Sequence, residues 1–96
     1  MDAYTFERTD LASRTLAARE RAKVVEKLAL EARVTLNLSN VKSISESFAD
    51  ELFGVLVLER GLEFVTRRLK IEGAQDNVLR SIAIAMKRRS SALQVA

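Results

Sequence analysis

The sequence predicts a small single-domain α/β fold, with a sheet of about three to four mostly parallel strands and three helices packed on it. Its 96 residues suffice for one domain. The spacing of apolar residues changes along the chain between two, typical of strands, and three to four, typical of helices. Strand and helix patterns alternate, and strands separated by helices pair in parallel through right-handed crossovers.

The N-terminal segment has the pattern of a short strand. Tyr4 and Phe6 alternate with polar residues, which favours a strand or an arm that packs on the domain. We therefore assign residues 1–12 to an N-terminal arm or short strand. A second short strand is predicted at residues 14–16.

A first helix is predicted from about Leu16, and a strand follows it. The apolar stripe of the helix is rich in alanine, so the helix is expected to pack closely on its neighbour. In the next segment, Val34, Leu36 and Leu38 alternate with polar residues before the turn at residues 39–40, which predicts the strongest strand of the chain. The stripe of the helix consists of Ala18, Ala22, Val25, Leu28, Ala29 and Ala32.

The second helix is predicted at residues 47–60. Ser47 and Asp50 have the spacing of a capping box, and Gly61 follows the last residue. At 100° per residue, one face of this helix presents Ala49, Leu52, Phe53 and Leu56 to the core.

The opposite face of this helix is predicted to point outward and consists of Gly54, Val55 and Leu58. A glycine there lets another backbone approach. The face is therefore expected to contact a protein partner or a second copy of the chain. The alternative is that the N-terminal arm covers it through Tyr4 and Phe6.

A last strand and helix complete the domain. Leu69 and Ile71 alternate with charged residues, which predicts a short strand at the edge of the sheet, ended by Gly73. Asp76 or Asn77 can cap the third helix. Residues 90–96 are expected to form a frayed tail. The core stripe of the helix consists of Val78 or Leu79, Ile82, Ala83 and Met86.

Composition excludes several kinds of active site. The chain has neither Cys nor His, so it has no disulfide, thiolate nucleophile, Cys/His zinc site or His general base. Asp50 and Glu51 are the candidate catalytic carboxylates. Both lie in the first turn of a predicted helix, where the helix dipole favours acids, and no His or Lys accompanies them. We expect no catalytic residues, no metal, no cofactor and no enzymatic activity.

The sequence also gives no sign of a membrane or secreted protein. The longest uncharged apolar run, residues 52–58, is far shorter than the ~20 residues of a membrane-spanning helix. The first residues lack the basic and apolar regions of a secretory signal. We therefore expect a cytoplasmic protein with no membrane contact.

Basic residues are concentrated near the C-terminus. Residues 65–96 contain seven of the 16 Lys and Arg residues but two of the 13 acidic ones. Such a cluster suits nucleic-acid binding, because cations displace counterions from phosphates. The simpler interpretation is a solvated surface with cations at a helix C-terminus. Nucleic-acid binding is therefore the alternative function, and its candidate residues are Arg80, Lys87, Arg88 and Arg89.

The segment from residue 34 to residue 53 resembles a bacterial STAS-like family of unknown function. In that family an apolar strand and a turn lead into Ile-Ser-x-Ser-Phe-Ala-Asp-Glu-Leu-Phe, which this chain matches at residues 44–53. Residues 16–22 and 68–71 are similar to the family's first helix and its following strand. The resemblance implies a STAS-like domain at residues 13–89. The chain departs from the family pattern at Ala18, Asn37 and Asn40, where Ser, Asp and Gly are usual.

The family is distantly similar to STAS domains, including anti-anti-sigma factors. In those regulators a partner kinase phosphorylates a serine at a strand-to-helix junction, and Ser47 takes that position here. The resemblance implies a non-catalytic regulatory module that binds a protein partner, a histidine-kinase-like ATPase, through the junction at residues 45–48 and the helix at 47–60. The implied partner-binding residues are Ser45, Phe48, Asp50, Glu51, Gly54, Val55 and Leu58.

Two alternatives remain open. Ser47 can be a phosphoacceptor, because a phosphate at a helix N-terminus is favoured by free N–H groups, or it can be only the N-cap of the helix. The chain can also be a structural homo-oligomer rather than a switch.

Overall fold

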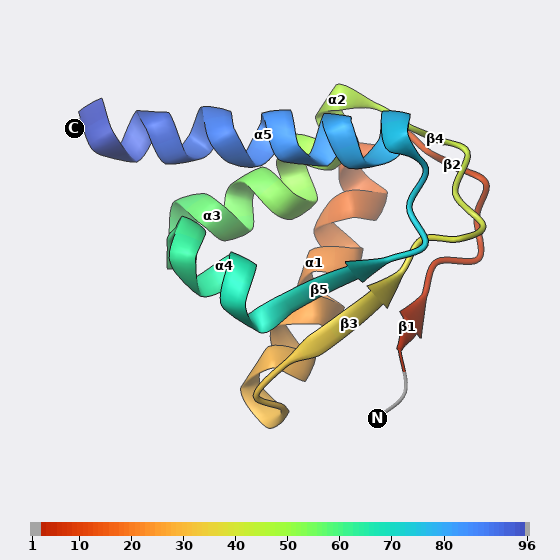
Figure 1. Ribbon diagram of the computed structural model, residues 1–96, viewed down its shortest axis with the longest axis horizontal. Helices are drawn as coiled ribbons and strands as arrows, with labels where there is room; N and C mark the ends of the chain where they lie inside the picture. The colour runs from red at the N-terminus through yellow and green to blue at the C-terminus, as the bar shows by residue number, and fades with distance from the viewer. Residues whose placement is uncertain (1–2, 96) are drawn as a thin grey trace.

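Three parallel strands form the central sheet of the computed structural model, which describes residues 3–95, with side chains for residues 3–92 (Figure 1). The strands β1 (Tyr4–Thr5), β3 (Val34–Asn37) and β5 (Leu69–Glu72) lie in the order β1-β3-β5. The predicted α/β class and parallel pairing are confirmed, and β5 is an edge strand, as predicted.

A second parallel sheet has two strands, and the later of these strands comes just before the helical segment that begins at Glu46. It pairs β2 (Asp10–Leu11) with β4 (Ser43–Ile44), neither of which is predicted from the sequence. The strand predicted at residues 14–16 is wrong. Those residues are helical, because the Ser13 side chain accepts a hydrogen bond from the backbone N–H of Leu16 at 3.1 Å and starts the helix there.

The helices leave one face of the central sheet uncovered, where Lys70 and Glu72 of β5 are exposed. In Figure 1, α5 runs across the top of the molecule, and α3 and α4 lie below its C-terminal half. The predicted second helix is present but has three parts, a short α-helix, a π-helical turn and a further α-helix. Helix α4 is not predicted. The helices are α1 (Arg14–Leu30), α2 (Glu46–Ala49), the π-helix η1 (Asp50–Gly54), α3 (Val55–Arg60), α4 (Leu62–Arg68) and α5 (Asp76–Val95).

Helix α1 buries a different face from the predicted one. Ala17, Val24 and Leu28 are buried, whereas Ala22 and Ala29 of the predicted alanine stripe are exposed. Leu28 belongs to the predicted stripe, so the buried face is rotated from that stripe by about one residue, which brings Val24 into the core in place of the alanines at 22 and 29.

The core lies between the sheet, α1 and the helices of the second half. The predicted inner face of the second helix is buried, including Leu52 and Phe53. Helix α5 buries Val78 and Ile82 as predicted, but Leu79 is 46% exposed and Ala83 of the predicted core stripe is also exposed. Helix α5 continues to Val95, so the segment expected to be a frayed tail is helical up to that residue. Ala96 lies outside the described residues.

Within the part of the chain that the structure describes, no helix is both long and apolar enough to cross a membrane.

Candidate functional site

Ser45 caps helix α2 at the junction that follows β4. Its backbone is extended, with φ −78° and ψ 158°, and its Oγ accepts a hydrogen bond from the N–H of Phe48 at 3.0 Å. The same hydroxyl donates to the carbonyl of Ala12 at 2.9 Å, which ties the junction to the chain after β2. The predicted cap at Ser47 is therefore wrong. Ser47 is already inside the helix, and the hydroxyl of Ser45 reaches the unpaired N–H first.

Ser47 is thereby left available for another role. Its side chain is half-buried, and its Oγ lies 3.1 Å from the Oγ of Ser45 and 3.3 Å from the carbonyl oxygen of Ala12. Ser47 lines an open groove of about 430 Å³ between α2, the start of α1 and one side of α5. We call it the arginine groove. Its lining residues are Arg14, Glu46, Ser47, Asp50, Ser81, Ile84, Ala85, Arg88 and Arg89.

Two carboxylates beside the groove are held by arginines from two other helices. Arg89 of α5 donates two hydrogen bonds to Asp50, at 2.8 and 2.7 Å. Arg14 contacts both Asp50 and Glu51, at 3.3 and 3.2 Å. Arg21 pairs with Glu51 at 2.6 Å and also donates to its backbone carbonyl. Such bidentate and shared pairs fix the geometry of the groove wall.

The arginines also change the acidity of the two carboxyl groups. Hydrogen bonds from Arg89 hold the pKa of Asp50 below its ordinary value, and hydrogen bonds from Arg21 do the same for Glu51. In both cases the ionised form is favoured by donors that point at it. These carboxylates therefore remain charged at neutral pH and serve as ion-pair partners rather than as proton donors.

This network makes stability depend on pH. Because the folded pKa values lie below the ordinary values of 3.8 for Asp50 and 4.5 for Glu51, the stabilisation is complete above those values. We expect the free energy of unfolding to fall as the pH drops below about 4.5, measured by urea denaturation at several pH values. The Asp50→Asn/Glu51→Gln double variant should be less stable at pH 7 and should lose less stability on acidification. Equal pH dependence in both proteins would contradict the assignment.

The three residues of the predicted outward face of the second helix differ in their exposure to solvent. Leu58 is 39% exposed and Val55 is half-buried, but Gly54 is buried. A Cβ atom at Gly54 would lie 3.0 Å from Cγ of Arg89 and 3.4 Å from the backbone oxygen of Ala85, both in α5. Another backbone does approach Gly54 closely, as predicted, but it is that of α5 in the same chain. Neither a partner nor the N-terminal arm therefore covers this position.

Phe48, another predicted contact residue, is fully buried. Its ring belongs to the core beneath the junction, so it can orient the junction but does not meet a partner directly. Of the predicted residues, Ser45, Ser47, Asp50 and Glu51 are brought together at or beside the arginine groove.

The four cations of the nucleic-acid alternative do not form one surface. Arg89 is bound to Asp50, and Arg88 lies 3.9 Å from Glu46 beside the arginine groove. At 100° per residue, Arg80 lies about 180° from Arg89 around the helix. Lys87 is also on that far flank, where it lines a different hollow.

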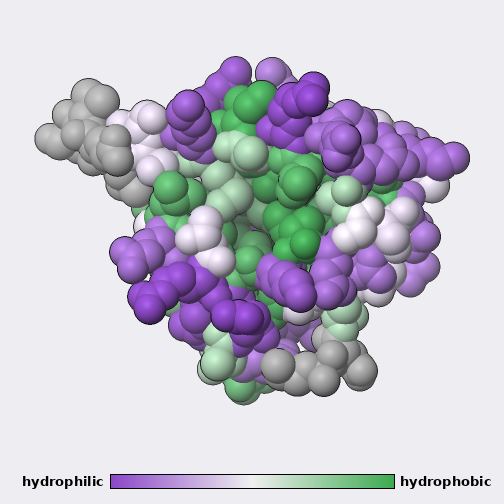
Figure 2. Space-filling model, viewed as in Figure 1, coloured by the Kyte–Doolittle hydropathy of each residue, from purple (hydrophilic) through white to green (hydrophobic). Residues whose placement is uncertain are grey.

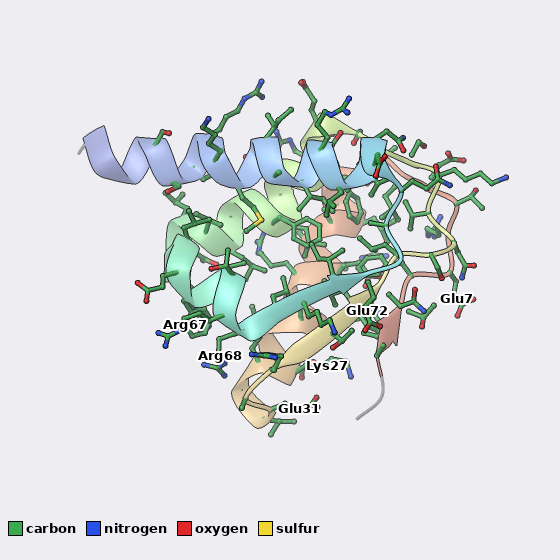
Figure 3. All side chains as sticks on the ribbon, in the orientation of Figure 1. Glu7, Lys27, Glu31, Arg67, Arg68 and Glu72 are labelled. Atoms are coloured by element: carbon green, nitrogen blue, oxygen red, sulfur yellow. The ribbon has the colours of Figure 1, made fainter. Side chains whose placement is uncertain are left out.

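Arg68 stabilises the end of α1, a role that the sequence does not reveal. Its guanidinium donates to the backbone carbonyls of Leu28 and Glu31, at 3.0 and 3.1 Å, and to that of Ala32. It also lies 4.8 Å from the centre of the Phe64 ring. Figure 3 shows Arg68 at the sheet end of α4, near the C-terminal end of α1. Part of the C-terminal basic excess is therefore structural, because Arg68 satisfies carbonyls that a helix end leaves unpaired.

A comparison with family models decides the classification. A model described as a STAS-like domain of unknown function matches residues 17–79. The chain belongs to this family. The match spans most of α1, the junction with Ser45 and Ser47, and the first turn of α5. It leaves β1, β2 and the arginines at 88 and 89 outside. Searches of curated proteins and of solved structures gave no match for this STAS-like domain.

Proposed function

We propose that this STAS-like domain is a non-catalytic regulatory module that binds a protein partner through the junction at residues 45–48 and the following helix, and that phosphorylation of Ser47 releases the partner. The observation that carries the proposal is the position of Ser47. It lines an open groove while Ser45 holds the helix cap. Modification of Ser47 therefore leaves the cap of α2 in place.

The chemistry of this switch is that of a protein kinase reaction. The Oγ of Ser47 would form a bond to the γ-phosphorus of ATP, the bond from that phosphorus to ADP would break, and the hydroxyl proton would be released. The phosphate brings a charge of about −2 at neutral pH. It would lie among Glu46, Asp50 and three arginines, where it competes with the carboxylates for the guanidinium groups. Both the charge and the pairing at the junction would change.

The partner that the family resemblance implies is a histidine-kinase-like ATPase. We expect calorimetric titration with the purified ATPase encoded nearest to this chain's gene to show binding by the wild type and Ser47→Ala. Ser47→Asp should stay folded and bind at least about tenfold more weakly, a loss of about 1.4 kcal/mol. Incubation with ATP should add one phosphate at Ser47, detected by mass spectrometry.

Ser45→Ala is the matched control. Loss of the cap should destabilise the fold by about 1 kcal/mol, whereas Ser47→Ala should change stability less. At a temperature where Ser45→Ala is fully folded, it should lose less affinity for the ATPase than Ser47→Asp, because it removes a junction hydroxyl but adds no charge. A folded Ser47→Asp that binds normally would contradict the switch, and absence of wild-type binding would contradict this choice of partner.

A further inference from the structure

A second groove lies on the opposite flank of α5 and is mainly apolar. It consists of two adjoining hollows of about 210 and 440 Å³, which share Thr66, Ala83 and Met86. Ile71 of β5 lines the first hollow and Leu62 of α4 the second. Figure 2 shows apolar side chains gathered in the middle of this face, with hydrophilic side chains around them. We call this feature the β5 groove.

One wall of the β5 groove is the open edge of the central sheet. Strand β5 is last in the order β1-β3-β5. The carbonyl of Glu72 accepts the N–H of Leu38, so the backbone groups of Glu72 point toward β3. Alternate residues of a strand direct their N–H and C=O to opposite sides. The N–H and C=O of Ile71 and the C=O of Leu69 therefore point away from β3. This is the arrangement to which another extended chain can pair.

The rim of the groove carries positive charge. Lys87 lines the larger hollow, and Arg80, two helical turns earlier, lies on the same flank of α5. Within residues 3–92, neither takes part in an ion pair, whereas Arg88 and Arg89 on the other flank do. A second copy of the chain would bring the same cations to this rim. Charge complementarity therefore favours an acidic occupant over self-association.

We propose that the β5 groove binds an extended segment of an acidic partner protein, which adds to β5 as a further strand. The backbone of the segment pairs with Leu69 and Ile71. Alternate side chains of a strand point to opposite faces, so apolar side chains enter the groove against Met86, and acidic side chains between them reach toward Arg80 and Lys87. This surface is separate from the junction at residues 45–48, and the inference does not rest on the proposed function.

A synthetic peptide tests this inference. The probe is an acetylated and amidated seven-residue peptide of alternating valine and glutamate, titrated into the ¹⁵N-labelled full chain. We expect shifts of the Ile71 amide signal and slower hydrogen exchange of that amide on binding. The equivalent valine–lysine peptide should bind at least about tenfold more weakly, because Lys87 and Arg80 repel it.

Variants on one helix locate the site. Ala83→Asp places a charge in the groove and should weaken binding of the valine–glutamate peptide at least about tenfold, while Ala92→Asp, an exposed position that lines neither groove, should leave it unchanged. Lys87→Glu should reverse the preference between the two peptides. The proposal is overturned if the glutamate peptide causes no shift at Ile71, if its shifts cluster at the arginine groove, or if sedimentation shows a dimer that Ala83→Asp dissociates.

Discussion

Replacing Gly54 by leucine will lower the free energy of unfolding by at least about 3 kcal/mol. Gly54 is buried where η1 packs on α5, and even a Cβ atom there would lie 2.7 Å from Oδ1 of Asp50 and 3.0 Å from Cγ of Arg89. A leucine side chain would separate η1 from α5 and break the bidentate Asp50–Arg89 pair. Urea denaturation followed by circular dichroism measures the change.

Two further substitutions define the cause of this effect. Val55→Leu enlarges the neighbouring half-buried residue and should cost less than about 1 kcal/mol. Gly54→Ala adds helix propensity worth up to about 1 kcal/mol but must displace the Asp50 carboxylate, so it should be less destabilising than leucine. A leucine variant as stable as the wild type would show that α5 can move away from η1 at no cost.

Replacing Arg68 by methionine will destabilise the protein by about 2 kcal/mol. The guanidinium donates to three backbone carbonyls at the end of α1, and methionine keeps much of the aliphatic contact while removing every donor. The neighbouring Arg67 is the matched control, since it makes one exposed ion pair with Glu63 at 3.3 Å. Arg67→Met should change the free energy of unfolding by less than about 0.5 kcal/mol.

Thermal denaturation of the two variants side by side distinguishes a specific contact from a general effect of charge, because both substitutions remove one positive charge from adjacent positions. Faster hydrogen exchange of amides in the last turn of α1 should accompany the loss in Arg68→Met alone. Equal destabilisation by the two substitutions would mean that the hydrogen bonds to α1 contribute nothing beyond the charge.

Periodicity predicted the long elements of this fold and missed the short ones. The strand at residues 34–37 and the helix that ends at Arg60 carry enough apolar residues for their spacing to be recognised. Strands β2 and β4 have two residues each, too few to establish a period. Helix α4 follows Gly61 directly. Of its seven residues only Val65 is buried, so its sequence has too few core positions to show the apolar spacing of a helix.

The candidate site was only partly predictable for a different reason. The family resemblance located Ser47, but the cap belongs to Ser45, because two hydroxyls two residues apart compete for the same N–H groups and local spacing cannot rank them. The arginine groove depends on Arg14 and Arg89, which are 36 and 39 residues from Asp50. Only tertiary packing brings them together. Glycine at position 54 was correctly associated with a close approach, whereas the identity of the neighbour required the fold.

The all-parallel pairing of the strands has a consequence for how this chain folds. Within residues 3–95, each of the three strand pairs joins residues about 33 positions apart, and no strand pairs with the one next to it in sequence. No hairpin is therefore available as a local nucleus, and each pairing must close a long loop before its contacts form. Helix formation and apolar collapse are expected to precede the sheet. A chain shortened by residues 1–12 loses the outer partner of both β3 and β4 at once, leaving two further strand edges open to association with other chains.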